Sequence, residues 1–167
     1  FYLIPVVFIT SGLFVVILSY WSERYRNGGI SLLRANVNSA VKKLGIVSLL
    51  ITVSSLLLAG PITRLAFNRG IFPSKDLAEV GKVFSFYMLG FVPFMLSQVF
   101  TRVHLTLKNT RILMYAAFLK VVLKIPLNYL LIKLFQVSGI ALAHGLVSTV
   151  NLFFLGAFFY RLTKQSE

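Results

Sequence analysis

The run from Ile112 to Leu134 constrains the fold of this chain most, because it is apolar and about as long as a bilayer is thick. About 20 helical residues, at ~1.5 Å of rise each, cross the hydrocarbon core of a membrane. Lys120, Lys124 and Asn128 recur along this run, each four residues after the last. Residues four apart lie on one side of a helix, so the run predicts a membrane-spanning rod with one polar stripe.

The composition agrees with a membrane protein and excludes several other classes. Of the 167 residues, 57% are hydrophobic, and the mean hydropathy of +0.85 is too high for a soluble domain. The net charge of +13 suggests nucleic acid in a soluble protein, but here most basic residues lie between apolar runs, where they meet anionic headgroups. Nucleic-acid binding is therefore not predicted. With no cysteine and two histidines, neither a metal site nor a cofactor is predicted.

Five apolar runs predict an all-α polytopic membrane protein with five membrane-spanning helices. Their approximate bounds are 3–20, 44–59, 80–105, 112–134 and 139–160. Between the first two, residues 31–43 favour a short amphipathic helix on the membrane surface. Pro93 is predicted to kink the third helix, and Tyr20 and Trp21 are typical of the membrane–water interface. Because the chain opens inside an apolar run without a methionine, we expect a fragment that lacks its N-terminal part.

Five crossings alternate sides, and the loops divide the basic residues unequally between the two sides. The side predicted to contain the C-terminus has ten of them: Arg24, Arg26, Arg34, Lys42, Lys43, Arg102, Lys108, Arg111, Arg161 and Lys164. The other side has five: Arg64, Arg69, Lys75, Lys82 and Lys133. By the positive-inside rule, this imbalance predicts a cytoplasmic C-terminus.

The stripe residues are the candidate substrate-binding residues. A lysine at the centre of a membrane-spanning helix costs roughly 2.5 to 3.5 kcal/mol on insertion scales, so it usually faces a cavity or a partner. Lys124 fits this description best, and the alternative for both stripe lysines is that their long stems carry the charge to the interface. The five predicted helices contain no carboxylate, so either a bound phosphate or pyrophosphate, or an acid from elsewhere, would pair with Lys124. Asn128 is either a ligand contact or a helix–helix hydrogen bonder.

The remaining polar residues favour a transporter over an enzyme. Arg102 and Arg111 lie near predicted helix ends, where they contact lipid headgroups or, alternatively, the headgroup of a substrate. His144 is either satisfied by a neighbouring carbonyl or hydroxyl group or belongs to a proton relay. The four acidic residues are scattered through loops and ends, and the phosphate-binding loop of ATPases is absent.

Several segments together resemble one known family. Residues 60–72, GPITRLAFNRGIF, resemble the EPIVRLLFERGAF segment of the MurJ/MviN family. Residues 108–111 lie where the family has QDTR, and residues 127–132 and 139–143 are similar to its LNLLLI and GLALA stretches. Together with a likeness of residues 4–22 to a helix of the family, the resemblance covers nearly the whole chain.

The resemblance implies a lipid II flippase of the MOP exporter superfamily. Such proteins have two six-helix lobes, like MATE transporters, and move an undecaprenyl-pyrophosphate-linked sugar across the bacterial inner membrane by alternating access. This chain, residues 1–167, would be most of the C-terminal lobe. Its partners would be the lipid-linked oligosaccharide, membrane lipids and an absent N-terminal lobe. The family has small or hydroxyl residues at the positions of Lys120 and Lys124, so it assigns these lysines no role.

Three other functions remain open. A flippase for another polysaccharide lipid would need the same kind of polar path through the membrane. A cation-coupled antiporter of the same superfamily would need acidic residues inside the membrane, and the predicted helices contain none. A truncated, non-transporting membrane protein is the third alternative.

Overall fold

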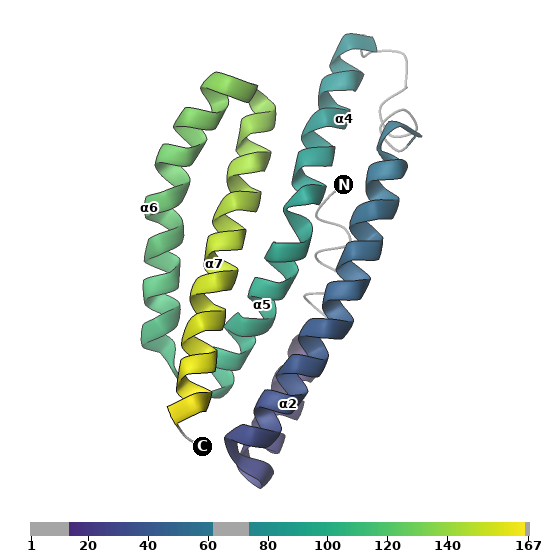
Figure 1. The fold of residues 1–167 in the computed structure, drawn as a ribbon. Coiled ribbons are helices and arrows are strands. Elements are labelled where there is room, and N and C mark those ends of the chain that lie inside the picture. The colour runs from purple at the N-terminus through teal and green to yellow at the C-terminus, as the bar shows by residue number, and fades with distance from the viewer. Residues whose placement is uncertain (1–13, 62–73, 166–167) are drawn as a thin grey trace.

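The computed structural model describes residues 14–61 and 74–165, and its regular elements in these ranges are all α-helices. They are α2 (Phe14–Leu57), α4 (Ser74–Leu89), α5 (Phe91–Thr106), α6 (Thr110–Phe135) and α7 (Val137–Gln165). Figure 1 shows α6, α7, the α4–α5 pair and the long part of α2 side by side, with successive helices running in alternate directions. Most of the predicted first helix and most of the GPITRLAFNRGIF segment lie outside the described residues.

Three stretches of the described chain are long and apolar enough to cross a membrane: Gly29–Leu57, Glu79–Thr106 and Val137–Lys164. α6 is not among these three stretches, so the predicted count of five spans is not confirmed. Its bounds nevertheless match the predicted 112–134 closely, and it exposes large apolar side chains, including Met114, Phe118, Val121, Ile125 and Leu134. A helix face this apolar is stable only against lipid or another protein. The described chain is therefore an all-α polytopic membrane protein, as predicted.

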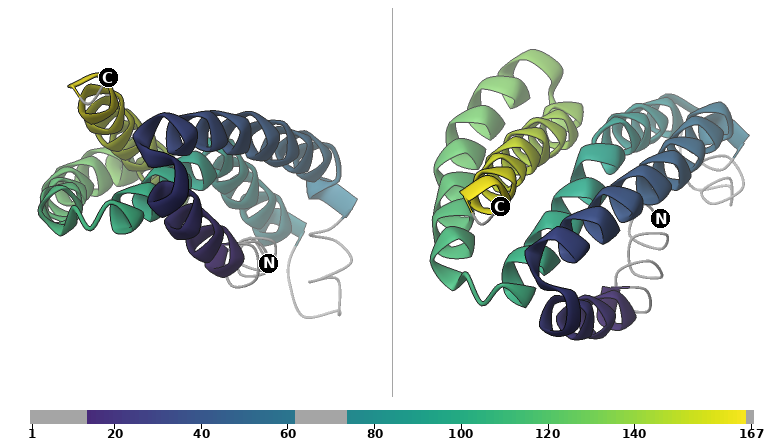
Figure 2. Two further views of the ribbon diagram at one scale, coloured as in Figure 1. Left: turned by 90° about the horizontal axis from the view of Figure 1, so that it is seen from below. Right: turned by 60° about the horizontal axis from the view of Figure 1, so that its bottom comes forward.

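Helix α2 differs most from the prediction. The loop and surface helix expected between residues 21 and 43 are instead continuous helix, interrupted only at Gly29. This glycine has φ 67° and ψ −162°, a backbone conformation that is accessible because glycine has no Cβ. Figure 2 shows the two parts of α2 meeting there at a sharp bend. The helix predicted to begin near residue 44 therefore begins directly after Gly29.

The segment expected on the membrane surface is buried because α2 packs along α5. The Leu33 and Val37 side chains are fully buried in the core that includes Phe91 and Val99 of α5. Trp21 belongs to the same core and is 2% exposed, so it packs against protein, and its predicted position at the membrane–water interface stays a prediction. Apolar side chains on one side of an amphipathic helix are buried equally well by a lipid surface or by another helix, and the sequence pattern does not distinguish these partners.

The third predicted helix, residues 80–105, is observed as two helices that join at Gly90. Pro93 has no N–H for the carbonyl oxygen of Leu89, and its ring crowds that carbonyl group, so the irregular residue lies in the turn before the proline. Close to this joint, the Thr52 hydroxyl of α2 donates a hydrogen bond of 3.4 Å to the carbonyl oxygen of Met88. The predicted interruption near Pro93 is therefore confirmed, and α2 contributes a polar contact beside it.

Helix α7 is central, because it packs against α6, α5 and α4. Where α7 crosses the joint between α4 and α5, Gly145 lies directly against Gly90. A Cβ atom added to Gly90 would lie 2.6 Å from the Cα atom of Gly145, so the two backbones are already in contact. Small residues allow such close helix crossings in membranes. Gly90 and Gly145 are therefore the residues that allow α7 to cross the α4–α5 joint this closely.

Candidate functional site

The predicted polar stripe lies along α6, and its three members differ in exposure. Lys120 and Lys124 are exposed, whereas Asn128 is half-buried. The Asn128 Oδ1 atom is buried and has no hydrogen-bond partner among the described residues. A buried amide oxygen of this kind is normally paired, so its position is suited to a donor from a bound molecule or from another part of the protein.

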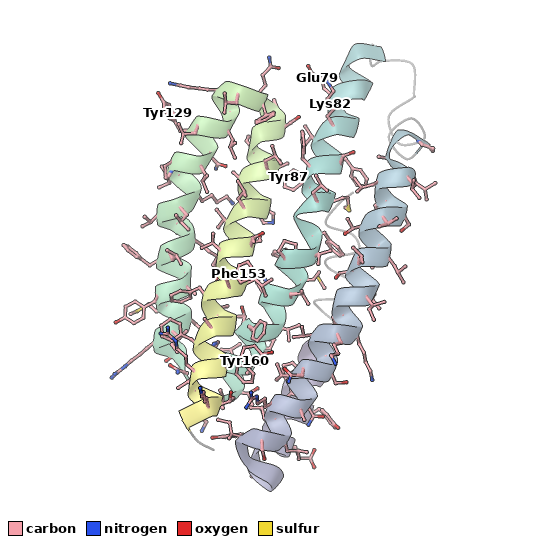
Figure 3. The ribbon with its side chains drawn as sticks, viewed as in Figure 1. Glu79, Lys82, Tyr87, Tyr129, Phe153 and Tyr160 are labelled. Atoms are coloured by element: carbon pink, nitrogen blue, oxygen red, sulfur yellow. The ribbon has the colours of Figure 1, made fainter. Side chains whose placement is uncertain are left out.

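Lys133 does not belong to this stripe. Its ammonium nitrogen lies 4.2 Å from the centroid of the Tyr129 ring, a cation–π contact on the same helix. Figure 3 shows Tyr129 directed away from α7. Lys133 thus has an aromatic partner near the end of α6, and it provides a natural comparison for Lys124.

The α6–α7 hairpin brings His144 to the level of the stripe. The two helices are joined by Gln136 alone, with φ 53° and ψ −135°. Asn128 and His144 are equally far from Gln136 in the sequence, so they lie at similar heights on the antiparallel pair. Lys124 lies close enough to His144 for its positive charge to act on the imidazole ring.

Two aromatic rings flank His144 on its other sides. The imidazole centroid lies 5.5 Å from the ring centroid of Phe94 on α5 and 5.9 Å from that of Tyr87 on α4. Figure 3 shows Tyr87 projecting from α4 toward α7. These contacts depend on the close crossing of Gly90 and Gly145, because Gly145 directly follows His144. We call Lys124, Asn128, His144, Tyr87 and Phe94 together the Lys124 site.

The Lys124 site contains a cation and no described carboxylate. The acidic side chains that the structure describes are Glu23 and Glu79, and both are exposed. Glu79 lies about 12 Å from Tyr87 along α4, at ~1.5 Å of rise per residue. An ammonium group in this environment is suited to an anionic ligand, because a charge-assisted hydrogen bond compensates part of the cost of desolvating it.

The other two candidate contacts, Arg102 and Arg111, lie away from this site. Arg111 is in the first turn of α6, about 20 Å from Lys124 along the helix axis at ~1.5 Å per residue. Arg102 is half-buried in the last part of α5, and Figure 1 shows that this end of α5 leads into the start of α6. The structure therefore does not bring these arginines to Lys124.

The second histidine, His104, has a structural contact. Its side chain is fully buried on α5, and its Nε2 atom donates a hydrogen bond of 3.0 Å to the carbonyl oxygen of Leu155 on α7. This bond could not be predicted from the sequence, because it depends on how α5 and α7 are placed side by side. This hydrogen bond joins α5 to α7. It lies between the Gly90–Gly145 crossing and the C-terminus of α7.

Comparisons with known proteins agree on one family. The family model described as lipid II flippase MurJ matches residues 1–167, the whole chain. A probable lipid II flippase MurJ of Rickettsia prowazekii is 24% identical over 166 residues, which are 99% of this chain and 32% of that protein. The lipid II flippase MurJ of Thermosipho africanus is 25% identical over 155 residues, 93% of this chain and 32% of that protein.

A shorter match has higher identity. A probable lipid II flippase MurJ of Helicobacter pylori strain J99 is 33% identical over 100 residues, which are 60% of this chain and 22% of that protein. The chain thus spans about a third or less of the length of these relatives. No solved structure matches the chain. Because the family model covers every residue, and the described helices are those of a polytopic membrane protein, the chain belongs to the lipid II flippase MurJ family.

Proposed function

We propose that this chain is part of a flippase that moves lipid II across the bacterial inner membrane. The family match and the names of the relatives support this proposal. The structural observation that carries it is the Lys124 site, where an ammonium group lies within electrostatic reach of His144 on the neighbouring helix and no described carboxylate belongs to the site. The pyrophosphate of a lipid-linked sugar supplies the missing negative charge.

In this proposal the polar stripe contacts the headgroup while the polyprenyl tail stays in lipid. A charged headgroup does not cross the hydrocarbon core unaided, since an unpaired charge there is costly. Lys120 lies one turn from Lys124, about 6 Å along α6, so the headgroup can pass from one ammonium group to the next. The exposed apolar side of the same helix faces the lipid in which the tail moves.

Alternating access requires that the helices around the headgroup move relative to a second part of the transporter. The joint at Gly90, and Pro126 within α6, are the places where these helices depart from regular hydrogen bonding. The chain spans about a third of the length of these two relatives, so we propose that a second lobe completes the path. A cation-coupled antiporter is less well supported, because Glu23 and Glu79, the described carboxylates, are exposed and remote from the Lys124 site.

The orientation in the membrane is part of the same proposal. In Figure 1 the bend of α2, the α5–α6 connection and the end of α7 lie at one end of the bundle. Basic residues gather at these places: Arg26, Arg34, Lys108, Arg111, Arg161 and Lys164. By the positive-inside rule, this end and the C-terminus face the cytoplasm.

Replacing Lys124 by alanine tests the function directly. In liposomes that contain the complete product of the gene, the rate of translocation of fluorescent lipid II is expected to fall at least tenfold. A hydrogen bond to a charged group contributes ~1.5–3 kcal/mol, and 1.4 kcal/mol corresponds to a factor of ten. Lys124→Arg, which keeps the positive charge, is expected to retain more activity than Lys124→Ala.

The matched control is Lys133→Ala, which removes a lysine from the same helix but breaks only the contact with Tyr129. This variant is expected to translocate lipid II at nearly the normal rate. Equal rates for Lys124→Ala and the unchanged protein, at equal amounts of folded protein, would show that Lys124 does not contact the substrate.

A further inference from the structure

His144 has surroundings that a histidine used only for packing does not need. It is half-buried, lies between two aromatic rings, and is within reach of the electrostatic field of Lys124 on the neighbouring helix. The fully buried His104 has a different contact, because its Nε2 atom donates to the carbonyl oxygen of Leu155. The two histidines lie on adjacent helices, and the charge of Lys124 acts on His144.

The neighbourhood of Lys124 and His144 is suited to an anion. The ammonium group and the imidazole come from adjacent helices, and neither of the described carboxylates, Glu23 and Glu79, belongs to the Lys124 site. A phosphate group between the two side chains would accept hydrogen bonds from both. The imidazole can donate one N–H even when it is neutral.

Two rings pack close to this imidazole and restrict the directions that it can take. Tyr87 and Phe94 lie 5.9 and 5.5 Å from it, centroid to centroid, and come from the two helices that meet at Gly90. A side chain held in one rotamer loses less conformational entropy when it binds a ligand. A donor positioned in this way recognises where the acceptor atom of a ligand lies, as well as the charge of that atom.

We propose that His144 donates a hydrogen bond to a phosphate oxygen of the polyprenyl-pyrophosphate headgroup that Lys124 binds, while Tyr87 and Phe94 fix the direction of the imidazole ring. The two helices of the α6–α7 hairpin then contribute one binding group each. This inference rests on the proposed function, because it takes the same headgroup as its ligand.

Ligands that differ only in their phosphate groups test this inference. The complete product of the gene is purified in nanodiscs, and its affinities for undecaprenyl pyrophosphate and for undecaprenol, which has no phosphate, are measured by native mass spectrometry. His144→Leu is expected to weaken pyrophosphate binding about tenfold, the effect of removing one hydrogen bond to a charged group. Its affinity for undecaprenol is expected to stay within twofold of normal.

Two more variants separate hydrogen bonding from packing. His144→Gln keeps an N–H donor, and it is expected to bind undecaprenyl pyrophosphate within about threefold of normal. His144→Phe keeps a ring between Tyr87 and Phe94 but has no donor, so it is expected to lose as much affinity as His144→Leu. His144→Phe also replaces His144→Leu in the comparison if the leucine variant does not fold.

The outcomes distinguish this inference from the proposed function. If Lys124→Ala weakens pyrophosphate binding but neither donor-free variant of His144 does, the role of His144 is overturned and the proposed function survives. If none of these variants weakens the binding of undecaprenyl pyrophosphate, both the role of His144 and the proposed function are overturned. If a donor-free variant weakens undecaprenol and undecaprenyl pyrophosphate equally, His144 supports only the packing of the helices, and the inference is wrong.

Discussion

Replacing Gly139 by alanine is expected to prevent α6 and α7 from closing their hairpin. The added Cβ atom would collide with the carbonyl oxygen and carbon of Leu131, and it would lie 2.8 Å from the backbone nitrogen of Ile132. Overfilling a packed site with side-chain neighbours costs ~1–3 kcal/mol, and backbone atoms yield less than side chains do. We therefore expect a loss of about 3 kcal/mol or more. The measurement is the melting temperature of the purified protein, together with the amount of folded protein in the membrane.

The matched control for this variant is Gly156→Ala, on the same helix. A Cβ atom at Gly156 would lie 3.6 Å from the ring of Phe100, which is an ordinary van der Waals distance. This variant is expected to melt close to the unchanged protein. A Gly139→Ala protein that melts at the normal temperature would mean that the hairpin is wider than described, and the placement of His144 beside Lys124 would need revision.

The hairpin also shows which parts of the fold the sequence was able to predict. Helix α6 was predicted almost to the residue because a continuous apolar run has polar residues at both ends. Residues 31–43 were predicted to be helical, but their placement on the membrane surface was wrong because the sequence shows an amphipathic face but not its partner. The steric requirement at Gly139 was also missed. It arises from a connection of one residue, Gln136, and the sequence there favoured a slightly longer turn.

The same distinction holds for the candidate site. The spacing of Lys120, Lys124 and Asn128 was sufficient to predict a stripe on one helix. The proximity of Lys124 to His144 was not predicted, although the equal distances of Asn128 and His144 from the turn place these two residues at similar heights once the turn is known. Tyr87 and Phe94 gave no signal, since they reach His144 only through the crossing of α4–α5 with α7. The structure adds the second helix of the site, and that helix is the basis of the inference about His144.

Replacing Gly90 by alanine is expected to separate α7 from the joint between α4 and α5. The added Cβ atom would lie 2.6 Å from the Cα atom and 3.2 Å from the nitrogen of Gly145, so one of the two helices has to move. Tyr87 and Phe94 would then move away from His144, because their helices join at Gly90. We expect a loss of stability of about 2–3 kcal/mol, the upper part of the usual range for overpacking, and weaker binding of undecaprenyl pyrophosphate.

The reciprocal variant, Gly145→Ala, is expected to be less harmful to stability than Gly90→Ala. A Cβ atom at Gly145 would lie 3.1 Å from the Cα atom of Gly90, so Gly145→Ala is expected to lower the melting temperature less than Gly90→Ala does. Gly60→Ala is the control, because no described atom beyond its own chain neighbours and helix backbone lies within 4 Å of the Cβ position there. If Gly145→Ala proved the more harmful of the two, the helices would cross elsewhere. If Gly90→Ala lowered stability but left pyrophosphate binding unchanged, the aromatic rings would not position His144 for the substrate, because this crossing is what brings those rings to the imidazole.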